Sequence, residues 1–390
     1  MRGGLRSVTH IWMLLALAGL LGAPPALAQE TGTVTLEASP RRVTFGEQVT
    51  LSGAVSPAAA GETVEIVDAA TDEVLTQATT NGAGAYSVAL EPERSIVLFA
   101  RSGIASSDQV GVDVLPVVAT GLSNVFLFAE ALARGHVRPA IAGEKVTVWL
   151  MRRTRKAEQV SATVRADGSF SARLPVERPG AYRARVEYAP DGYLAARDES
   201  AVRTTPLPGL AQGSHAKAVR ALELRLDELH YRIQGINQSF DYRTGDAVLA
   251  FHKVQGMPRV KNVTRATWYR LARPRVPKPV VTKPSNHIEI DQTRQVLYVV
   301  QKGEIAFIVH TSTGAGGATR DGVFYVNRKI AGYSPNNLYY PSYFDGGRAV
   351  HGWPDVPTYP ASHGCSRVPY WTAIWLHSIM GYGMQVRVYH

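Results

Sequence analysis

Cysteine is almost absent from this sequence, since Cys365 is the only one among 390 residues. A single cysteine excludes a disulfide framework and every metal site that is built from several thiolates. Charged residues are also few, at 19%, whereas hydrophobic residues make up 45% of the chain. This composition excludes a disordered chain and a protein with many membrane spans, and it is sufficient for several buried cores. At about 150 residues per domain, the length predicts two to three domains.

Long hydrophobic runs are equally scarce, and the one notable run lies near the N-terminus. Residues 11–23 are apolar, but this run is shorter than the ~20 residues that span a bilayer. Two arginines precede it, and Ala26-Leu27-Ala28 follows it as a small-x-small cleavage pattern. We therefore predict that residues 1–28 are a cleaved signal peptide rather than a retained anchor. The mature protein is expected in the cell envelope, cell wall or periplasm, without a membrane span.

The region after this segment contains an internal repeat. Residues 53–64 match residues 135–146 at an offset of 82, and both copies are rich in valine and threonine. Apolar and polar residues alternate, with breaks at glycine, proline, asparagine or aspartate about every 8–12 residues, which predicts small antiparallel β-sandwiches. The pair resembles tandem bacterial Ig-like domains, placed at 29–115 and 116–207. Neither copy has a cluster of titratable residues, so we expect a spacer or an interaction module.

Helical periodicity replaces strand alternation in residues 208–272. Apolar side chains recur three and four positions apart in three short segments, which predicts a three-helix unit with N-caps at Thr244 and Thr264. Four prolines and four basic residues follow between 271 and 285. We interpret residues 273–285 as an extended, semi-stiff linker. Strand patterning then returns and continues to the C-terminus.

The formal net charge of +10 is unevenly distributed. Residues 29–115 have 12 acidic and 4 basic side chains, whereas residues 208–283 have 5 acidic and 14 basic ones. Residues 116–207 are also basic, with 14 basic and 9 acidic side chains. The sequence shows no nucleic-acid-binding motif, and an exported protein does not meet nucleic acid. We therefore expect anionic cell-envelope polymers as electrostatic partners and no nucleic acid.

Reactive side chains gather in two short motifs near the C-terminus. The first is His351-Gly352, and the second is Ser362-His363-Gly364-Cys365-Ser366-Arg367. Outside the cytoplasm an unpaired cysteine is either a buried passenger or a nucleophile. A neighbouring imidazole or guanidinium raises the thiolate fraction of a thiol, so this context favours a nucleophile. Gly364 allows the backbone to approach a substrate and to turn its amides toward a developing oxyanion.

Together these motifs resemble the signature of L,D-transpeptidases, the YkuD-like catalytic domain. The resemblance covers about residues 286–390 and includes four upstream segments, at 288–300, 311–314, 322–324 and 340–344. Two positions depart from the family pattern: Arg320 stands where proline is usual, and Ser366 replaces an apolar residue. The resemblance completes a mainly β multidomain prediction, with two Ig-like sandwiches, a helical unit, a linker and a β-rich catalytic domain.

The resemblance also implies a role for each site residue. Cys365 would be the nucleophile and His351 the general acid and base, with the Gly352 carbonyl fixing the tautomer of the imidazole. His363 and Arg367 would line the site, and the amides near Gly364 and Cys365 would form an oxyanion hole. The remaining residues predicted to contact substrate are Ser362, Gly352, Trp353 and Tyr340. No cofactor and no metal is expected.

The implied reaction is acyl transfer on peptidoglycan stem peptides. Cys365 would attack the L,D bond of a tetrapeptide stem, release the terminal D-alanine and form a thioester. An amine of a neighbouring stem would resolve the thioester and form a cross-link. If water resolved it, the enzyme would be an L,D-carboxypeptidase. A third reading is a non-catalytic cell-wall-binding protein that keeps a degenerate catalytic fold.

Other readings of the same residues are weaker. His351, His363 and Cys365 could ligate zinc, but the adjacent Arg367 opposes a cation. Residues 314–317 superficially suggest a phosphate loop, yet no nucleotide-binding unit surrounds them, so we interpret them as a turn. His377 is interpreted as structural. Tyr359 and Tyr370 are interpreted as ordinary core aromatics, with contact to substrate as the alternative.

The helical unit resembles the small peptidoglycan-binding domain. The matching positions are Val219, Leu222, Phe240, Ala247, Val248, Phe251, Trp268 and Leu271. Asn237-Gln238 and Asp241 depart from the residues that this family prefers. A helical spacer without affinity for the wall therefore stays open as the alternative.

Overall fold

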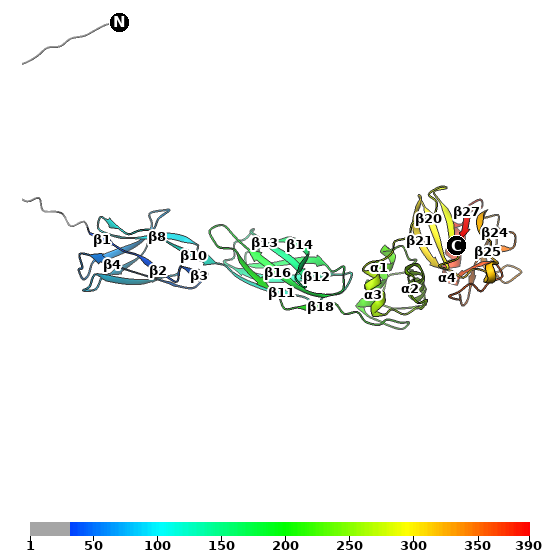
Figure 1. Ribbon diagram of the computed structural model, residues 1–390, viewed down its shortest axis with the longest axis horizontal. Coiled ribbons are helices and arrows are strands. Elements are labelled where there is room, and N and C mark those ends of the chain that lie inside the picture. The colour runs from blue at the N-terminus through cyan, green and yellow to red at the C-terminus, as the bar shows by residue number, and fades with distance from the viewer. Residues whose placement is uncertain (1–31) are drawn as a thin grey trace, which may run out of the picture. The chain divides into compact units, whose positions relative to one another are not determined.

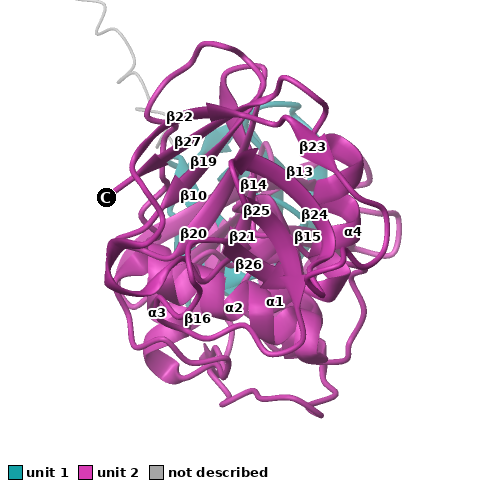
Figure 2. Ribbon diagram, turned by 90° about the vertical axis from the view of Figure 1, so that its right-hand side faces the viewer, with its two compact units in different colours: residues 1–113 teal, residues 114–390 magenta. Residues whose placement is uncertain are grey.

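The computed structural model describes residues 32–390, so the predicted signal peptide at 1–28 lies outside the described residues. The chain divides into two compact units, Met1–Asp113 and Val114–His390 (Figure 2). Most of the regular structure in residues 32–390 is strand, arranged in six sheets, with four α-helices that all lie in the second unit (Figure 1). The prediction of a mainly β multidomain chain is confirmed.

Two antiparallel sheets make up the first unit. One sheet has the order β1 (Thr33–Val34), β4 (Val49–Ser56), β2 (Glu37–Ser39), and β7 (Ala85–Leu90) also pairs with β4. The other runs β3 (Arg42–Thr44), β10 (Val110–Leu115), β8 (Ile96–Ser102), β5 (Thr63–Asp68), β6 (Val74–Thr79), with β9 (Ala105–Ser106) beside β8. Alternate residues of these strands are buried, as in half-buried antiparallel sheets.

A second pair of sheets begins the second unit. A three-stranded sheet contains β11 (Val117–Leu122), β12 (Glu130–Arg138) and β15 (Ser169–Pro175). A five-stranded sheet contains β14 (Arg155–Thr163), β13 (Lys145–Arg152), β16 (Ala181–Tyr188), β17 (Ala196–Glu199) and β18 (Arg203–Thr204). One hydrophobic core joins apolar side chains of both sheets, so they pack face to face.

The repeated glycines have a structural reason. Gly53 pairs with Tyr86 across β4 and β7, and Gly135 pairs with Phe170 across β12 and β15. A Cβ at Gly53 would lie 1.9 Å from the carbonyl oxygen of Thr35, and one at Gly135 would lie 2.4 Å from the ring of Phe170. A Cβ at Gly53 would also lie 2.6 Å from the Tyr86 hydroxyl. In both copies, the strand position opposite the aromatic residue therefore has room only for glycine. The Ig-like assignment of the two sandwiches stays a prediction.

Three helices follow, as the periodicity predicts: α1 (Lys217–Glu228), α2 (Tyr242–Gln255) and α3 (Arg265–Leu271). Thr264 caps α3 in a reciprocal capping box with Thr267. The predicted cap of α2 is wrong by three residues. The side chain of Asp241 accepts hydrogen bonds from the amides of Arg243 and Thr244 and is the N-cap. Thr244 lies inside the helix, where its hydroxyl donates to Glu223.

The C-terminal domain has two sheets and one helix. The first sheet has the order β21 (Glu304–His310), β20 (Val296–Gln301), β19 (His287–Asp291), β27 (Gln385–Tyr389), β22 (Gly322–Tyr325). The second contains β23 (Arg328–Lys329), β24 (Tyr339–Asp345), β25 (Arg348–Trp353) and β26 (Ser366–Pro369). Helix α4 (Tyr370–Ile379) follows β26 directly and shares a core with both sheets.

The helical unit and the C-terminal domain share a hydrophobic core. Side chains of α1 and α2, among them Leu222 and Phe251, belong to the same buried cluster as Val296 and Ile308 of β20 and β21. The segment at 273–285 is also tied down, since Gln255 exchanges two hydrogen bonds with the backbone of Arg275. The helices are therefore part of the framework that supports the C-terminal domain.

No helix among residues 32–390 has both the length and the apolar character needed to cross a membrane.

Candidate active site

The two sequence motifs meet on a parallel pair of strands. β25 and β26 pair in a register that sets His351 opposite Arg367. Val350 and Val368 point into the core between the sheets. Because side chains alternate along a strand, His351 and Arg367 lie on the opposite face. Cys365 immediately precedes β26 and is two residues before Arg367, so alternation places it on the same face as Arg367. Strand spacing then places the Cα atoms of His351 and Cys365 about 8 Å apart, a distance that two side chains can bridge.

A tight hydrogen-bonded turn presents the cysteine. The Ser362 hydroxyl donates to the Cys365 carbonyl at 2.6 Å and accepts from the Gly364 amide at 3.0 Å. Gly364 has φ +129°, and a Cβ there would lie 2.8 Å from Nε of Arg348. Only glycine fits this backbone conformation and this close contact. The Thr319 hydroxyl fixes the other side of the turn through a 2.9 Å bond to the Gly364 carbonyl.

This turn changes two roles that the resemblance implies. Ser362 is buried, and its hydroxyl donates one hydrogen bond and accepts one within the turn, so it holds the turn that carries the cysteine. The Gly364 amide donates to Ser362, so it does not point toward an oxyanion. Of the two amides expected in an oxyanion hole, that leaves the amide of Cys365.

His351 is held in one tautomer. Its side chain is buried, and Nδ1 lies 2.9 Å from the Gly352 carbonyl oxygen. A carbonyl can only accept, so Nδ1 carries the proton and Nε2 carries the lone pair. Burial lowers the pKa of His351 to about 4, although the bond to Gly352 opposes this and the charge of Arg367 adds to it. Near neutral pH the imidazole is therefore uncharged and able to accept a proton.

The thiol of Cys365 differs from the expectation. It is half-buried, with Sγ 3.8 Å from the Gly347 carbonyl oxygen. Burial raises its pKa above the ordinary cysteine value, and a hydrogen bond from the Ala349 backbone and the charges of Arg367 and Arg348 only partly oppose this. The sequence predicts a thiol with an increased thiolate fraction. Desolvation outweighs the cations because the thiolate is the charged form.

Arg367 and Trp353 form one side of the cluster. The guanidinium of Arg367 lies over the indole of Trp353, 4.2 Å from its centroid, and donates to the Ala361 carbonyl. The His351 ring meets the same indole edge to face, with centroids 5.8 Å apart. Trp353 thus holds the imidazole and the guanidinium together. Nε of Arg367 is buried without a partner among residues 32–390.

Arg348 belongs to the site, although no motif points to it. Its Nε donates to the Ala318 carbonyl at 2.8 Å, and its Nη1 pairs with Asp345 at 2.9 Å. Asp345 also pairs with Arg320, the residue that stands in place of the usual proline. A β-bulge in β24, between Tyr343 and Asp345, sets Asp345 opposite Arg348. Alternation along the sequence would place Arg348 on the other face from His351, so sequence reasoning missed it.

Ser366, the second departure from the family pattern, is fully buried behind the nucleophile. Its hydroxyl lies 2.6 Å from the Thr311 hydroxyl, which donates onward to the Arg367 carbonyl at 2.7 Å. The neighbouring Ser312 exchanges two backbone bonds with Arg367. The polar side chain is therefore satisfied, and it ties β26 to the segment that follows β21.

The remaining predicted residues lie around this cluster. Gly352 is a close-packing position, since a Cβ there would lie 2.8 Å from the rings of both Tyr339 and Tyr370. Tyr340 has φ +49°, and its ring contacts Tyr339 and His377. His363 is exposed next to Gly364. Across residues 32–390, no three His, Cys, Asp or Glu side chains form a group that could hold a metal ion.

Comparison with known proteins bears on this arrangement. Residues 285–388 match the family of the L,D-transpeptidase catalytic domain. The chain is similar to an L,D-transpeptidase from Xylanimonas cellulosilytica, with 33% identity over 47% of this chain and 99% of that chain, at a TM-score of 0.44. The chain belongs to the L,D-transpeptidase family. The resemblance stated from the sequence is thereby confirmed.

The chain is also similar to a second solved structure. It is an L,D-transpeptidase from Stackebrandtia nassauensis, with 25% identity over 46% of this chain and 95% of that chain, at a TM-score of 0.31. A search of curated proteins gave no match.

Proposed function

We propose that this L,D-transpeptidase is an exported cysteine acyltransferase that cross-links peptidoglycan stem peptides. The observation that carries the proposal is the parallel pairing of β25 with β26. It sets the neutral imidazole of His351 on one face with the Cys365 turn and with Arg367. A thiol, a base with one fixed tautomer and a cation on one face are what acyl transfer by a cysteine requires.

Proton transfer accompanies attack in the proposed mechanism. Cys365 begins as a thiol, because burial raises its pKa, and His351 begins neutral. As sulfur attacks the carbonyl carbon of the L,D bond, its proton passes to Nε2 of His351. The tetrahedral oxyanion is stabilised by the Cys365 amide and by the nearby positive charge of Arg367. Nε2 then gives the proton to the departing amine of D-alanine, which leaves the thioester.

The second half of the reaction reverses these roles. The amine of a neighbouring stem peptide attacks the thioester carbon, and His351 takes a proton from this amine. Collapse of the intermediate breaks the carbon–sulfur bond, and the proton on His351 returns to the sulfur. The products are a new amide cross-link and the free thiol. Water in place of the amine would give an L,D-carboxypeptidase by the same steps.

We assign the rest of the chain supporting roles. Residues 1–28 direct export, and the two N-terminal sandwiches, 29–115 and 116–207, serve as Ig-like spacer or interaction modules. The helical unit at 208–272 lies between them and the catalytic domain, joined to it by residues 273–285. Its fold is compatible with wall binding, and Asn237-Gln238 is the position at which that binding surface departs from the family preference.

The products from purified muropeptides test this function. We expect the full chain, incubated with tetrapeptide-bearing muropeptides, to release D-alanine and to produce cross-linked dimers that mass spectrometry detects. Cys365→Ala should abolish both products. Release of D-alanine without dimers would identify the carboxypeptidase instead. Neither product, together with no adduct between the intact protein and a carbapenem, would establish a non-catalytic wall-binding protein.

A further inference from the structure

A charged hollow lies on the second sandwich, far along the chain from the catalytic motifs. It has a volume of about 270 Å³ and lies between the β13–β14 turn and the loop after β15. Basic side chains dominate its lining, together with two glutamates and a tyrosine: Arg152, Arg155, Lys156, Glu158, Glu177, Arg178 and Tyr182.

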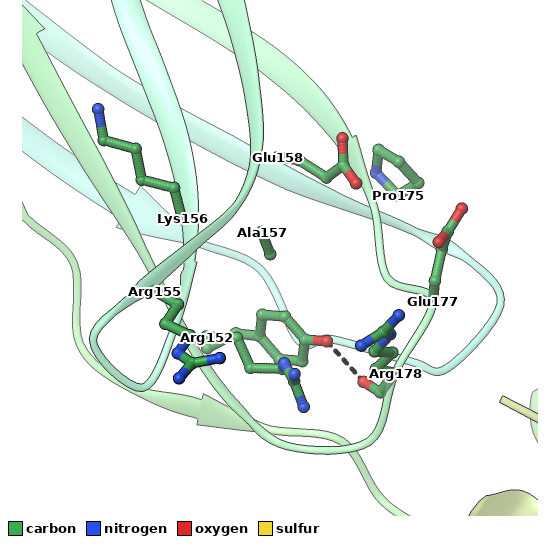
Figure 3. A pocket seen from close by; sticks show the side chains of 9 residues that line it. Arg152, Arg155, Lys156, Ala157, Glu158, Pro175, Glu177 and Arg178 are labelled. Carbon is green, nitrogen blue, oxygen red and sulfur yellow. Dashed lines mark hydrogen bonds between the residues drawn. The ribbon is translucent and has the colours of Figure 1, made fainter. Parts of the chain in front are cut away.

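The charges within this hollow are separated. Figure 3 shows the guanidinium groups of Arg152, Arg155 and Arg178 along the lower side of the hollow, whereas the carboxylates of Glu158 and Glu177 lie above them. Lys156 is directed away, and its ammonium group lies 4.6 Å from the Trp149 ring centroid. The hollow therefore offers three guanidinium groups at one end.

The local backbone supports this arrangement. The buried Tyr182 hydroxyl donates to the Arg178 carbonyl at 2.6 Å, which holds the loop against the sheet. A Cβ at Gly180 would lie 3.1 Å from Cδ of Arg152, so glycine leaves room for the Arg152 side chain to lie along the loop. The guanidinium of Arg152 also donates to the Pro179 carbonyl at 3.5 Å. Arg152 is therefore placed by the loop, whereas the side chains of Arg155 and Arg178 are exposed.

These arginines lack carboxylate partners. Among residues 32–390, no ion pair within 4.0 Å involves Arg152, Arg155 or Arg178. Four arginines elsewhere on the same sandwich are paired: Arg173 with Glu130, Arg183 and Arg185 with Glu199, and Arg197 with Glu187. Others, such as Arg134 and Arg165, also lack a carboxylate partner among residues 32–390, so what distinguishes Arg152, Arg155 and Arg178 is that they line one hollow. Three neighbouring unpaired guanidinium groups repel one another, and a bound oxyanion would relieve this repulsion.

We propose that this hollow binds an oxyanion, a phosphate or carboxylate group carried by an anionic polymer. Guanidinium groups match both anions in bidentate geometry. The carboxylates of Glu158 and Glu177 repel anions at the other end of the hollow. They therefore favour a polymer whose anionic groups are spaced apart over one whose anionic groups are adjacent. Binding here would hold the protein at an anionic surface without involving the catalytic domain, so the proposal is independent of the catalytic chemistry.

Binding of two polymer probes to the full chain tests the site. One probe is a glycerol phosphate oligomer, and the other is an oligogalacturonate. The variant Arg155→Gln/Arg178→Gln removes two unpaired charges, and the control Arg173→Gln/Arg197→Gln removes two paired ones. At low salt we expect the first variant to bind at least one probe about tenfold more weakly, and the control to change less than about twofold. The probe that is lost identifies the source of the oxyanion. Equal weakening in both variants, or no binding by the unmodified chain, would overturn the proposal.

A second inference comes from the contacts between the helical unit and the catalytic domain. Arg259, which follows α2, donates to the carbonyl oxygens of Thr358 at 2.8 Å and Thr293 at 3.0 Å. Thr358 lies in the segment that leads from β25 to the Cys365 turn. The adjacent Tyr359 carbonyl accepts from Ser312, whose backbone pairs with Arg367. One arginine thus restrains the segment that leads to the nucleophile.

A buried lysine makes a parallel connection. Nζ of Lys253, in α2, lies 2.9 Å from the Gln295 carbonyl, 2.8 Å from the Thr311 carbonyl and 2.7 Å from Nδ1 of His310. These three acceptors satisfy all three donors of an ammonium group. Thr311 in turn bonds the Arg367 carbonyl. Burial lowers the pKa of Lys253 well below the ordinary lysine value, so its role here rests on its hydrogen bonds and not on a full charge. Two side chains of the helical unit, Arg259 and Lys253, therefore reach segments that touch the nucleophile strand.

We infer that Arg259 is a positioning residue for the Cys365 turn, so that the helical unit contributes to acylation itself. This inference rests on the proposed acyltransferase function. Without Arg259, the segment before Ser362 loses the hydrogen bond at the Thr358 carbonyl and, with it, the link through the guanidinium to the Thr293 carbonyl. The turn then samples geometries in which sulfur is misplaced, and small misplacements reduce acylation strongly.

The rate of acylation by a soluble carbapenem, followed by intact-protein mass, tests this inference without any contribution from wall binding. We expect Arg259→Ala to slow the maximal acylation rate about tenfold with little change in the concentration for half-maximal rate, and Arg259→Lys to restore part of it. Arg265→Ala, on the same helical unit beside Tyr269, should acylate like the unmodified chain.

The possible outcomes are distinguishable. Unchanged acylation in Arg259→Ala would overturn the positioning role while leaving the enzyme intact. A loss that parallels a lower Tm and is not rescued by lysine would also overturn it, because it would reflect destabilisation alone. Failure of the unmodified chain to acylate would contradict the proposed function instead.

Discussion

The protonation state of Cys365 can be measured directly, because the chain has no other cysteine. The structure raises the pKa of this thiol by burial and lowers the pKa of His351 to about 4. An ordinary thiol has a pKa of about 8.5. The rate of alkylation by iodoacetamide follows the thiolate fraction. We therefore expect the pH midpoint of alkylation in the folded protein to exceed the midpoint of the same cysteine in urea.

The acylation rate should show a different pH profile. A thiol and a neutral imidazole are the active pair, so the rate falls only when His351 is protonated. With a pKa of about 4, less than about 1% of His351 is protonated at pH 6.5, where half of ordinary imidazoles would be. We expect the carbapenem acylation rate to be flat between pH 5.5 and 7.5, with its acid limb near 4 for the free enzyme.

One control separates this account from a preformed ion pair. Arg348→Gln removes a charge that favours the thiolate, so it should move the alkylation midpoint further upward. A folded-state midpoint below that of the unfolded chain, or an acid limb near 6.5, would refute the reasoning. It would mean that the thiolate and the imidazolium exist before substrate arrives.

Three further predictions concern the same cluster. His351 has a pKa of about 4 in the folded protein and about 6.5 in the unfolded chain, so the unfolded state binds more protons between these two values. The contribution of His351 to the free energy of unfolding is therefore complete above pH 6.5 and falls by about 3 kcal/mol as the pH approaches 4. Urea titrations should show this loss in the unmodified chain and not in His351→Gln. Gly364→Ala introduces a Cβ 2.8 Å from Arg348 at φ +129°, so acylation should fall more than about a hundredfold; near-normal acylation by mass would disprove the turn geometry. Ser362→Ala removes two buried hydrogen bonds and should lower Tm by several degrees and slow acylation, whereas an unchanged Tm would show that the hydroxyl is dispensable.

Local patterns in the sequence were sufficient to predict much of the fold. Alternation and the repeat predict the sandwiches, and the matched Gly53 and Gly135 prove to be the positions where an aromatic ring crosses the strand. Helix positions follow from periodicity. The N-cap of α2 cannot be predicted in this way, because Asp241 and Thr244 are both good N-cap residues. Only the hydrogen bonds that the Asp241 side chain accepts from backbone amides distinguish them.

The candidate site was predictable in its residue types but not in its electrostatics. Cys365, His351 and Arg367 stand in recognisable motifs, whereas desolvation depends on packing that no local pattern specifies. Arg348 enters through a β-bulge, and its partner Asp345 is only one of many acidic residues in the sequence. These features arise from tertiary contacts between segments that are distant along the chain.

The helical unit shows the same limit. Its sequence predicts three helices with an apolar face, but not which surface that face covers. The structure places it against β20 and β21, with Lys253 buried among carbonyls of the catalytic domain. A unit that resembles a binding module therefore also supports the active site.

The most direct measurement is the mass of the peptide that contains Cys365 after brief incubation with a tetrapeptide donor and rapid acid quench. The account predicts that this peptide carries the tripeptide acyl group in the unmodified chain, and that the adduct accumulates when no acceptor amine is supplied. An unmodified peptide alongside released D-alanine, or an adduct that persists in Cys365→Ala, would contradict the central claim that this sulfur is the acyl carrier.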